Sequence, residues 1–112
     1  MEIAESTKGA VKVLRPRGPL SLADADQFKR VASEAAQAAM GRLVVDASAI
    51  PFVDSRGLEV LVDLGETLGE SGQTLKLCAV NETLREVFDL TDVSAALELY
   101  EDVNAAVRSF LT

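Results

Sequence analysis

Histidine is absent from this chain of 112 residues, and cysteine occurs once, as Cys78. Histidine is the commonest general base of enzymes, so its absence excludes a Ser-His-Asp triad and histidine metal sites. A single cysteine excludes an internal disulfide, and its place in the apolar run 77–79 predicts a small buried side chain. This use of cysteine is typical of a protein from a reducing compartment.

Long hydrophobic runs and positive charge are also scarce. No run approaches the roughly 18 apolar residues that a membrane span needs. Residues 1–5 are acidic and lack the apolar segment of a signal peptide. The net charge of -7 argues against nucleic-acid binding, because a phosphate backbone requires a basic protein face. We therefore expect a soluble, cytoplasmic protein with no membrane insertion and no nucleic-acid partner.

The charge is unevenly distributed along the chain. Residues 1–56 carry 8 basic and 7 acidic side chains, whereas residues 57–112 carry 3 basic and 11 acidic ones. One interpretation is that the second half faces a basic partner. The other is that it forms a solvated acidic surface that favours solubility.

The motifs of several enzyme classes are missing as well. The chain has no G-x-S-x-G elbow and no G-x-x-x-x-G-K-[ST] phosphate loop. Its acidic residues show no metal or dyad spacing, and Asp46 after an apolar run reads as structural. We expect a non-enzymatic protein with no catalytic residues, no cofactor and no metal site.

The chain is the right length for a single domain, residues 1–112, and its 48% apolar residues suffice for one core. Residue patterns predict strands at 2–6, 10–14, 43–45, 74–79 and 97–100, and a loop at 15–19. Helices alternate with the later strands, and this order predicts an α/β fold: a mixed β-sheet of four to five strands with four helices.

Each predicted helix has a start signal and an apolar stripe. Ser21 and Asp24 have the spacing of a capping box, and Asn81 and Asp102 are predicted to cap the two later helices. The helical spacing predicts these buried stripes: Ala25, Phe28, Ala32, Ala35 and Ala39; Leu61, Leu64 and Leu68; Leu84, Val87 and Phe88; Val103, Ala106, Val107 and Phe110.

The most informative stretch is Ile-Pro-Phe-Val-Asp-Ser-Arg-Gly-Leu at residues 50–58. Asp54 is predicted to be the N-cap of the helix that carries the leucine stripe, which makes Ser55 its first residue. The start of a helix favours negative charge, so a phosphate on Ser55 would be stabilised there. The alternative is that Asp54 and Ser55 do no more than begin the helix.

This string, placed between an aliphatic strand and a helix, resembles the signature of STAS domains, in particular the free-standing anti-anti-sigma factors. The order of elements extends the resemblance over nearly the whole chain. The resemblance implies helices largely on one side of the sheet. It also implies that Ser55 is phosphorylated by a partner kinase, and that the partner binds Asp54, Ser55, Arg56, Gly57, Leu58 and the exposed side of the helix that follows.

By the same resemblance, the protein is an anti-sigma factor antagonist. Its partners would be a serine kinase that doubles as an anti-sigma factor, bound while Ser55 is unphosphorylated, and a phosphatase that resets the switch. The alternative is a non-switching STAS subunit of a transporter or a stressosome-like assembly. A small serine enzyme is disfavoured by the missing histidine.

Two departures from the family and one glycine leave questions open. Family members often carry Ser or Thr where Arg56 stands, and many carry an acid where Ser21 stands. Arg56 could pair with a phosphate on Ser55, or it could be an ordinary surface side chain. Gly57 could let a partner approach Ser55 closely, or it could let the helix pack tightly on its own domain.

Overall fold

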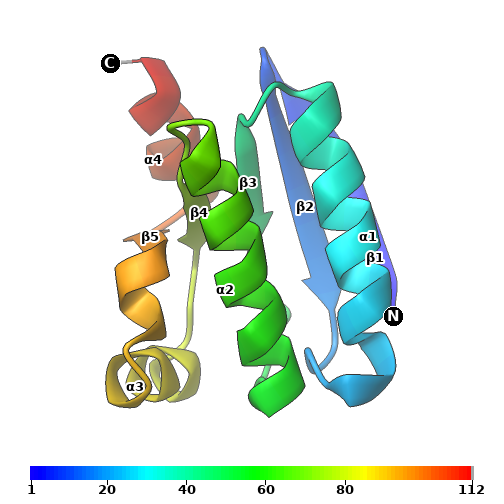
Figure 1. Cartoon of the computed structure of the whole chain (residues 1–112). Helices are drawn as coiled ribbons and strands as arrows, with labels where there is room; N and C mark the ends of the chain where they lie inside the picture. Colours follow the sequence, from blue (N-terminus) through cyan, green and yellow to red (C-terminus); the bar gives the residue numbers. More distant parts are fainter. Residues whose placement is uncertain (112) are drawn as a thin grey trace.

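The computed structural model describes residues 1–111 and shows a five-stranded sheet with strands in the order β1-β2-β3-β4-β5 (Figure 1). β1 and β2 form an antiparallel hairpin, and the remaining neighbours pair in parallel. The element bounds are β1 Glu2–Lys8, β2 Val11–Arg17, α1 Leu22–Ala38, β3 Leu43–Asp46, α2 Ser55–Glu70, β4 Leu75–Cys78, α3 Glu82–Leu90, β5 Leu97–Tyr100 and α4 Val103–Arg108, with short 3-10 helices at Val93–Ala96 and Ser109–Leu111. The α/β class, the five strands and the four helices are as predicted.

The two faces of the sheet bury different side chains, because neighbouring residues of a strand point to opposite faces. Figure 1 shows α1 and α2 lying side by side in front of the sheet, while α4 lies behind it. In β3, Val45 belongs to the large core under α1, α2 and α3, whereas Val44 belongs to the smaller core under α4. Three helices therefore share one face, which agrees with the resemblance to STAS domains.

The hairpin differs from the prediction at residues 15–17, which continue β2 instead of forming a loop. Pro16 pairs with Ile3 of β1, whereas the pairing of β2 with β3 ends at Leu14. Proline is tolerated here because no strand pairs with the far side of β2 at this point, so no ladder bond to β3 is lost. The side chain of Pro16 is buried. The sequence pattern showed the proline but could not show that only one neighbouring strand runs alongside it.

The predicted apolar stripes of α1 and α2 are buried. Phe28 of α1 and Val60 of α2 are fully buried in the same core, and the two helices pack against each other. The predicted capping box of α1 is wrong, because Ser21 makes no side-chain capping bond. Asp24 instead accepts a hydrogen bond from the N-terminal ammonium group at 3.2 Å.

The later caps are as predicted. Asn81 accepts a hydrogen bond from the N–H of Leu84, and Asp102 accepts one from the N–H of Ala105, each at 2.8 Å. The 3-10 helix at Val93–Ala96 was not predicted. Within residues 1–111, no helix is both long and apolar enough to span a membrane.

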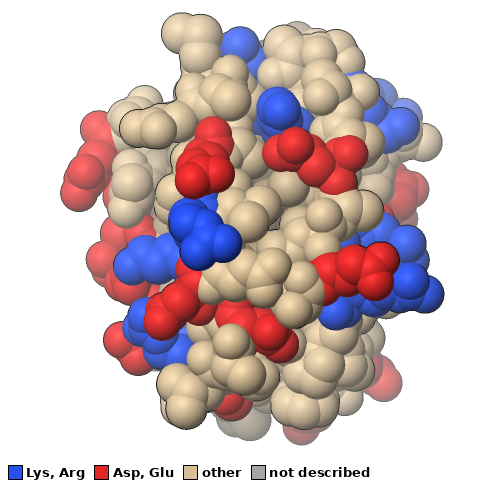
Figure 2. Space-filling view, turned by 90° about the vertical axis from the view of Figure 1, so that its right-hand side faces the viewer, with Lys and Arg blue, Asp and Glu red and all other residues tan. Residues whose placement is uncertain are grey.

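Figure 2 shows the face that carries α1, on which basic and acidic side chains alternate instead of forming a patch of one sign.

Candidate functional site

The predicted site lies where two loops meet beyond the carboxyl ends of the strands, at the bottom of the view in Figure 1. Leu20 donates its N–H to the carbonyl oxygen of Phe52 at 3.1 Å, and Asp54 donates its N–H to the carbonyl oxygen of Leu20 at 3.1 Å. Leu20 and Val53 also form an isolated parallel bridge. These backbone bonds hold the beginnings of α1 and α2 next to each other, although 33 positions separate Leu22 from Ser55.

Asp54 caps both helices. One carboxylate oxygen accepts the N–H of Gly57 at 2.9 Å, and the other accepts the N–H of Leu22 at 2.8 Å. These two backbone bonds, that from Gly57 foremost, lower the pKa of Asp54 below its ordinary value. The predicted cap of α2 is therefore present. The second bond, to α1, takes the place of the capping box expected at Ser21.

Ser55 is the first residue of α2, as the sequence predicted, and its side chain is exposed. Within residues 1–111 its hydroxyl has no hydrogen-bond partner, so no contact has to be broken before it reacts. A phosphate on this oxygen would lie at the N-terminal end of a 16-residue helix, where backbone N–H groups are unpaired and the helix dipole favours negative charge. The site can therefore accept a phosphate without refolding.

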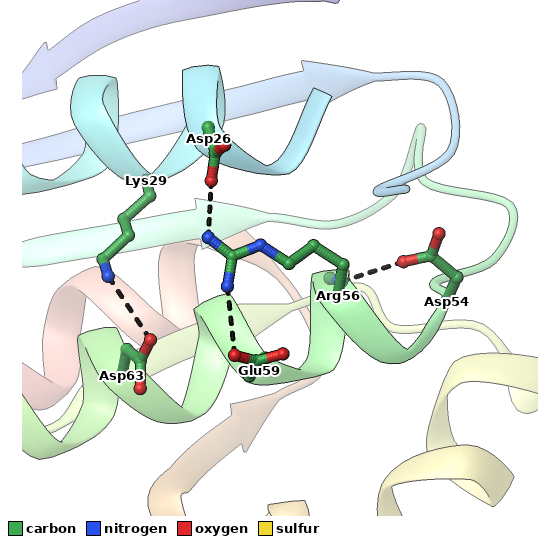
Figure 3. A network of polar contacts seen from close by, with 7 residues as sticks. Asp26, Lys29, Asp54, Arg56, Glu59 and Asp63 are labelled. Carbon is green, nitrogen blue, oxygen red and sulfur yellow. Dashed lines mark hydrogen bonds and ion pairs between the residues drawn. The ribbon is translucent and has the colours of Figure 1, made fainter. Parts of the chain in front are cut away.

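Arg56 is held by two carboxylates. Its guanidinium contacts Asp26 of α1 at 2.5 Å and Glu59 of α2 at 3.1 Å (Figure 3). The bond to Asp26 raises the pKa of Arg56 above its ordinary value. Two of the five N–H donors of the guanidinium are thus engaged, and a phosphate on Ser55 would compete with two carboxylates for its charge.

A second ion pair, between Lys29 of α1 and Asp63 of α2 at 3.3 Å, runs beside the contacts of Arg56 (Figure 3). The two pairs together link α1 to α2 across their exposed sides. These ion pairs contain three carboxylates, Asp26, Glu59 and Asp63, and two basic side chains, Lys29 and Arg56. Together the five groups carry one net negative charge.

Gly57 is buried and lies against the loop before α1. A β-carbon added here would come within 2.3 Å of the carbonyl oxygen of Leu20, closer than real contacts allow. Of the two interpretations of Gly57, the structure therefore favours tight packing of α2 on its own domain. Leu58 is half-buried and packs against the large core, so only part of its side chain reaches the surface.

Two exposed apolar side chains lie near the site: Phe52, which belongs to the stretch 50–58, and Leu22, which the sequence did not single out. Leu22 is 72% exposed and Phe52 is 48% exposed. Leu22 donates its backbone N–H to Asp54, and Phe52 stands two residues before Asp54 in the neighbouring loop. Only the tertiary structure brings the start of α1 next to the segment that carries Ser55, so Leu22 could not be linked to the site from its position in the sequence.

Other reactive groups lie away from this site. Cys78 is buried in β4, and burial raises the pKa of its thiol to about 12, which keeps it protonated and unreactive. Among residues 1–111, no three side chains of the metal-binding types are grouped closely enough to hold an ion.

The double cap predicts the effect of replacing Asp54. Asp54→Ala leaves the N–H groups of both Leu22 and Gly57 without their carboxylate. The midpoint of thermal unfolding should fall by roughly 10 °C, about twice the effect of losing one cap in a domain of this size. Asp54→Asn keeps one acceptor oxygen and should lose about half as much. Differential scanning calorimetry at pH 7 measures both changes.

Asp102→Ala, which removes a single capping bond from α4, is the matched control and should lower the midpoint only about half as much as Asp54→Ala. The stabilisation that Asp54 provides should also depend on pH. Because folding lowers the pKa of Asp54, its contribution is fully present above the ordinary value of 3.8 and is lost as the pH falls through the folded value. Equal midpoints for Asp54→Ala and Asp102→Ala would contradict the double cap.

Comparison with known proteins agrees with the fold described above. A Thermotoga maritima protein, named provisionally as an anti-sigma factor antagonist, is 26% identical over 99 residues, which cover 88% of both chains. A crystal structure with the same provisional description, also from Thermotoga maritima, has a TM-score of 0.89 at 22% identity and covers 98% of this chain and 95% of its own. The structure of the anti-sigma factor antagonist SpoIIAA in its unphosphorylated form has a TM-score of 0.74 at 17% identity, with 98% and 97% covered. The family model of the STAS domain matches residues 2–106, and the chain belongs to the STAS domain family.

Proposed function

We propose that this protein is a phosphorylation-switched anti-sigma factor antagonist. In its unphosphorylated form it binds a serine kinase that also acts as an anti-sigma factor, and this binding releases the sigma factor. Phosphorylation of Ser55 by that kinase ends the interaction, and a phosphatase restores it. The partner contacts the surface formed by Asp54, Ser55, Arg56, Leu58 and the exposed side of α2, while Gly57 shapes this surface from below.

One observation carries the proposal: an exposed serine hydroxyl, with no hydrogen-bond partner among residues 1–111, occupies the first turn of a helix whose cap, Asp54, also bonds to the start of α1. A kinase needs access to the hydroxyl, and the exposed position provides it. The names of the relatives, and the unphosphorylated form in which SpoIIAA was described, favour the same function.

The switch requires only local physics. A phosphate adds about 1.5 to 2 negative charges at pH 7 at the position of a hydroxyl that is uncharged. The helix start tolerates this charge, so the domain stays folded while its docking surface changes. Binding is lost because the partner would have to accommodate, and partly desolvate, the new group.

The test is phosphate transfer to the purified protein. Each serine kinase of the anti-sigma type encoded in the same genome is incubated singly with the protein and ATP, and the phosphate is located by mass spectrometry. We expect one kinase to modify wild type at Ser55 and to leave Ser55→Ala unmodified. Ser33→Ala is the matched control, because Ser33 is also exposed but lies in the middle of α1, and it should be modified like wild type.

Phosphate found on other residues only, or equal labelling of Ser55→Ala and wild type, would contradict the proposed switch. A partner that binds wild type but never transfers phosphate would point instead to a STAS subunit that binds permanently.

A further inference from the structure

We propose that Leu22 and Phe52 form the apolar centre of the docking surface, and that the partner offers an apolar pocket surrounded by basic side chains. This inference rests on the proposed function and adds to it the chemistry of the partner and the way in which phosphate acts. It is carried by Phe52, which lies within residues 50–58, and by Leu22, which lies outside that segment.

Exposure at the site is the first observation. Leu22 and Phe52 are two of the five large hydrophobic side chains that are exposed within residues 1–111. Leu22 is the first residue of α1 and Phe52 lies in the loop before α2. The hydrogen bond from the N–H of Leu22 to Asp54 and that from Leu20 to Phe52 hold these two segments together. Large apolar side chains on a rigid, exposed support are the usual anchors of protein interfaces. They also cost little entropy on binding when their backbone is already held.

The charge around these side chains gives the second observation. Asp26, which is 81% exposed, and Glu59, which is 64% exposed, hold the guanidinium of Arg56 between them. The pair leaves one net negative charge beside the apolar centre, and the half of the chain that contains α2 carries a large acidic excess. A partner complementary to this rim is basic.

The same arrangement decides how a phosphate on Ser55 acts. Its charge alone would attract a basic partner, so simple repulsion does not account for release. Ser55, however, directly follows Asp54, whose carboxylate accepts the N–H of Leu22, and it stands three residues after Phe52. A partner that seats both anchors would therefore cover the phosphate with apolar surface. The desolvation of the phosphate then opposes binding, and Arg56, already paired with two carboxylates, offsets it only in part.

The test measures the affinity of the kinase that modifies Ser55 for four purified proteins: wild type, Leu22→Gln, Phe52→Gln and Met40→Gln. We expect Leu22→Gln and Phe52→Gln to weaken binding about 10-fold or more, as for truncated interface anchors. Met40 is the matched control, because it is 74% exposed and lies beyond the other end of α1. Met40→Gln should bind like wild type, and all four proteins should unfold within a few degrees of one another.

A second arm tests the acidic rim that Asp26 and Glu59 form on this protein. Asp26→Asn combined with Glu59→Gln should reduce the dependence of association on salt, because charges on the rim of an interface mainly steer encounter. Wild-type affinity retained by both Leu22→Gln and Phe52→Gln would overturn the inference, while loss of binding on phosphorylation would leave the switch intact. Conversely, weak binding by these variants combined with equal affinity of modified and unmodified wild type would support the surface and refute the switch. If no anti-sigma kinase binds wild type, the proposed function fails and this inference fails with it.

Discussion

Protein phosphorylated on Ser55 is expected to bind its kinase at least about 100-fold more weakly than unmodified protein, which corresponds to about 2.7 kcal/mol. Burying a charged group without a partner at an interface costs about 2 to 5 kcal/mol. The guanidinium of the next residue in the chain, Arg56, is already paired with Asp26 and Glu59. Isothermal titration calorimetry on the purified phosphorylated and unphosphorylated forms measures the difference.

Two variants bracket this result. Ser55→Asp should fold normally, because an acid in the first turn suits the helix dipole, and it should weaken binding only in part, because a carboxylate carries less charge than a phosphate. Ser55→Ala should bind like wild type and remain bound in the presence of ATP. The affinities of the phosphorylated and unphosphorylated wild-type protein should also differ by about the same factor at high salt if desolvation dominates. If charge repulsion dominated, salt would screen it and the difference would shrink. Equal affinity of the two forms would reduce Ser55 to a helix-start residue.

Gly57→Ala should lower the free energy of unfolding by about 2 kcal/mol or more, which is a large fraction of the stability of a small domain. The new methyl group would lie 2.3 Å from the carbonyl oxygen of Leu20 and 3.1 Å from its carbonyl carbon. The carbonyl cannot move away freely, because it accepts the N–H of Asp54 and so belongs to the contact that joins the two loops. Urea denaturation followed by circular dichroism measures the loss.

Gly69→Ala is the matched control on the same helix. A β-carbon at Gly69 would meet nothing within 4 Å, so this change should stabilise the domain by about 0.5 to 1 kcal/mol through helix propensity alone. Opposite signs for the two substitutions would show that packing at Leu20, and not helix propensity, governs residue 57. A neutral Gly57→Ala would mean that α2 can shift away from Leu20 at little cost.

Local signals in the sequence were strong enough to predict α2 to the residue at its start. Asp54 has a short side chain that accepts backbone N–H groups, and the apolar stripe from Leu61 to Leu68 needs a helical period. Both properties depend on residues within a few positions of one another. The same kind of signal failed at Ser21, because a capping box cannot be distinguished from a carboxylate supplied by a loop more than thirty residues away. It failed at Pro16 because the cost of a strand proline depends on which neighbours the strand has.

The sequence by itself therefore determined the α/β class, the element that carries Ser55 and the cap that fixes its start, since capping and apolar period act over one or two helical turns. Only the tertiary structure decided that Asp54 joins two helices by accepting the N–H of Leu22, that Arg56 pairs with Asp26, and that Gly57 lies against Leu20. Each of these contacts joins residues about thirty or more positions apart. The packing of α1 beside α2 on one face of the sheet brings such residues together, and no local pattern records which of them will meet.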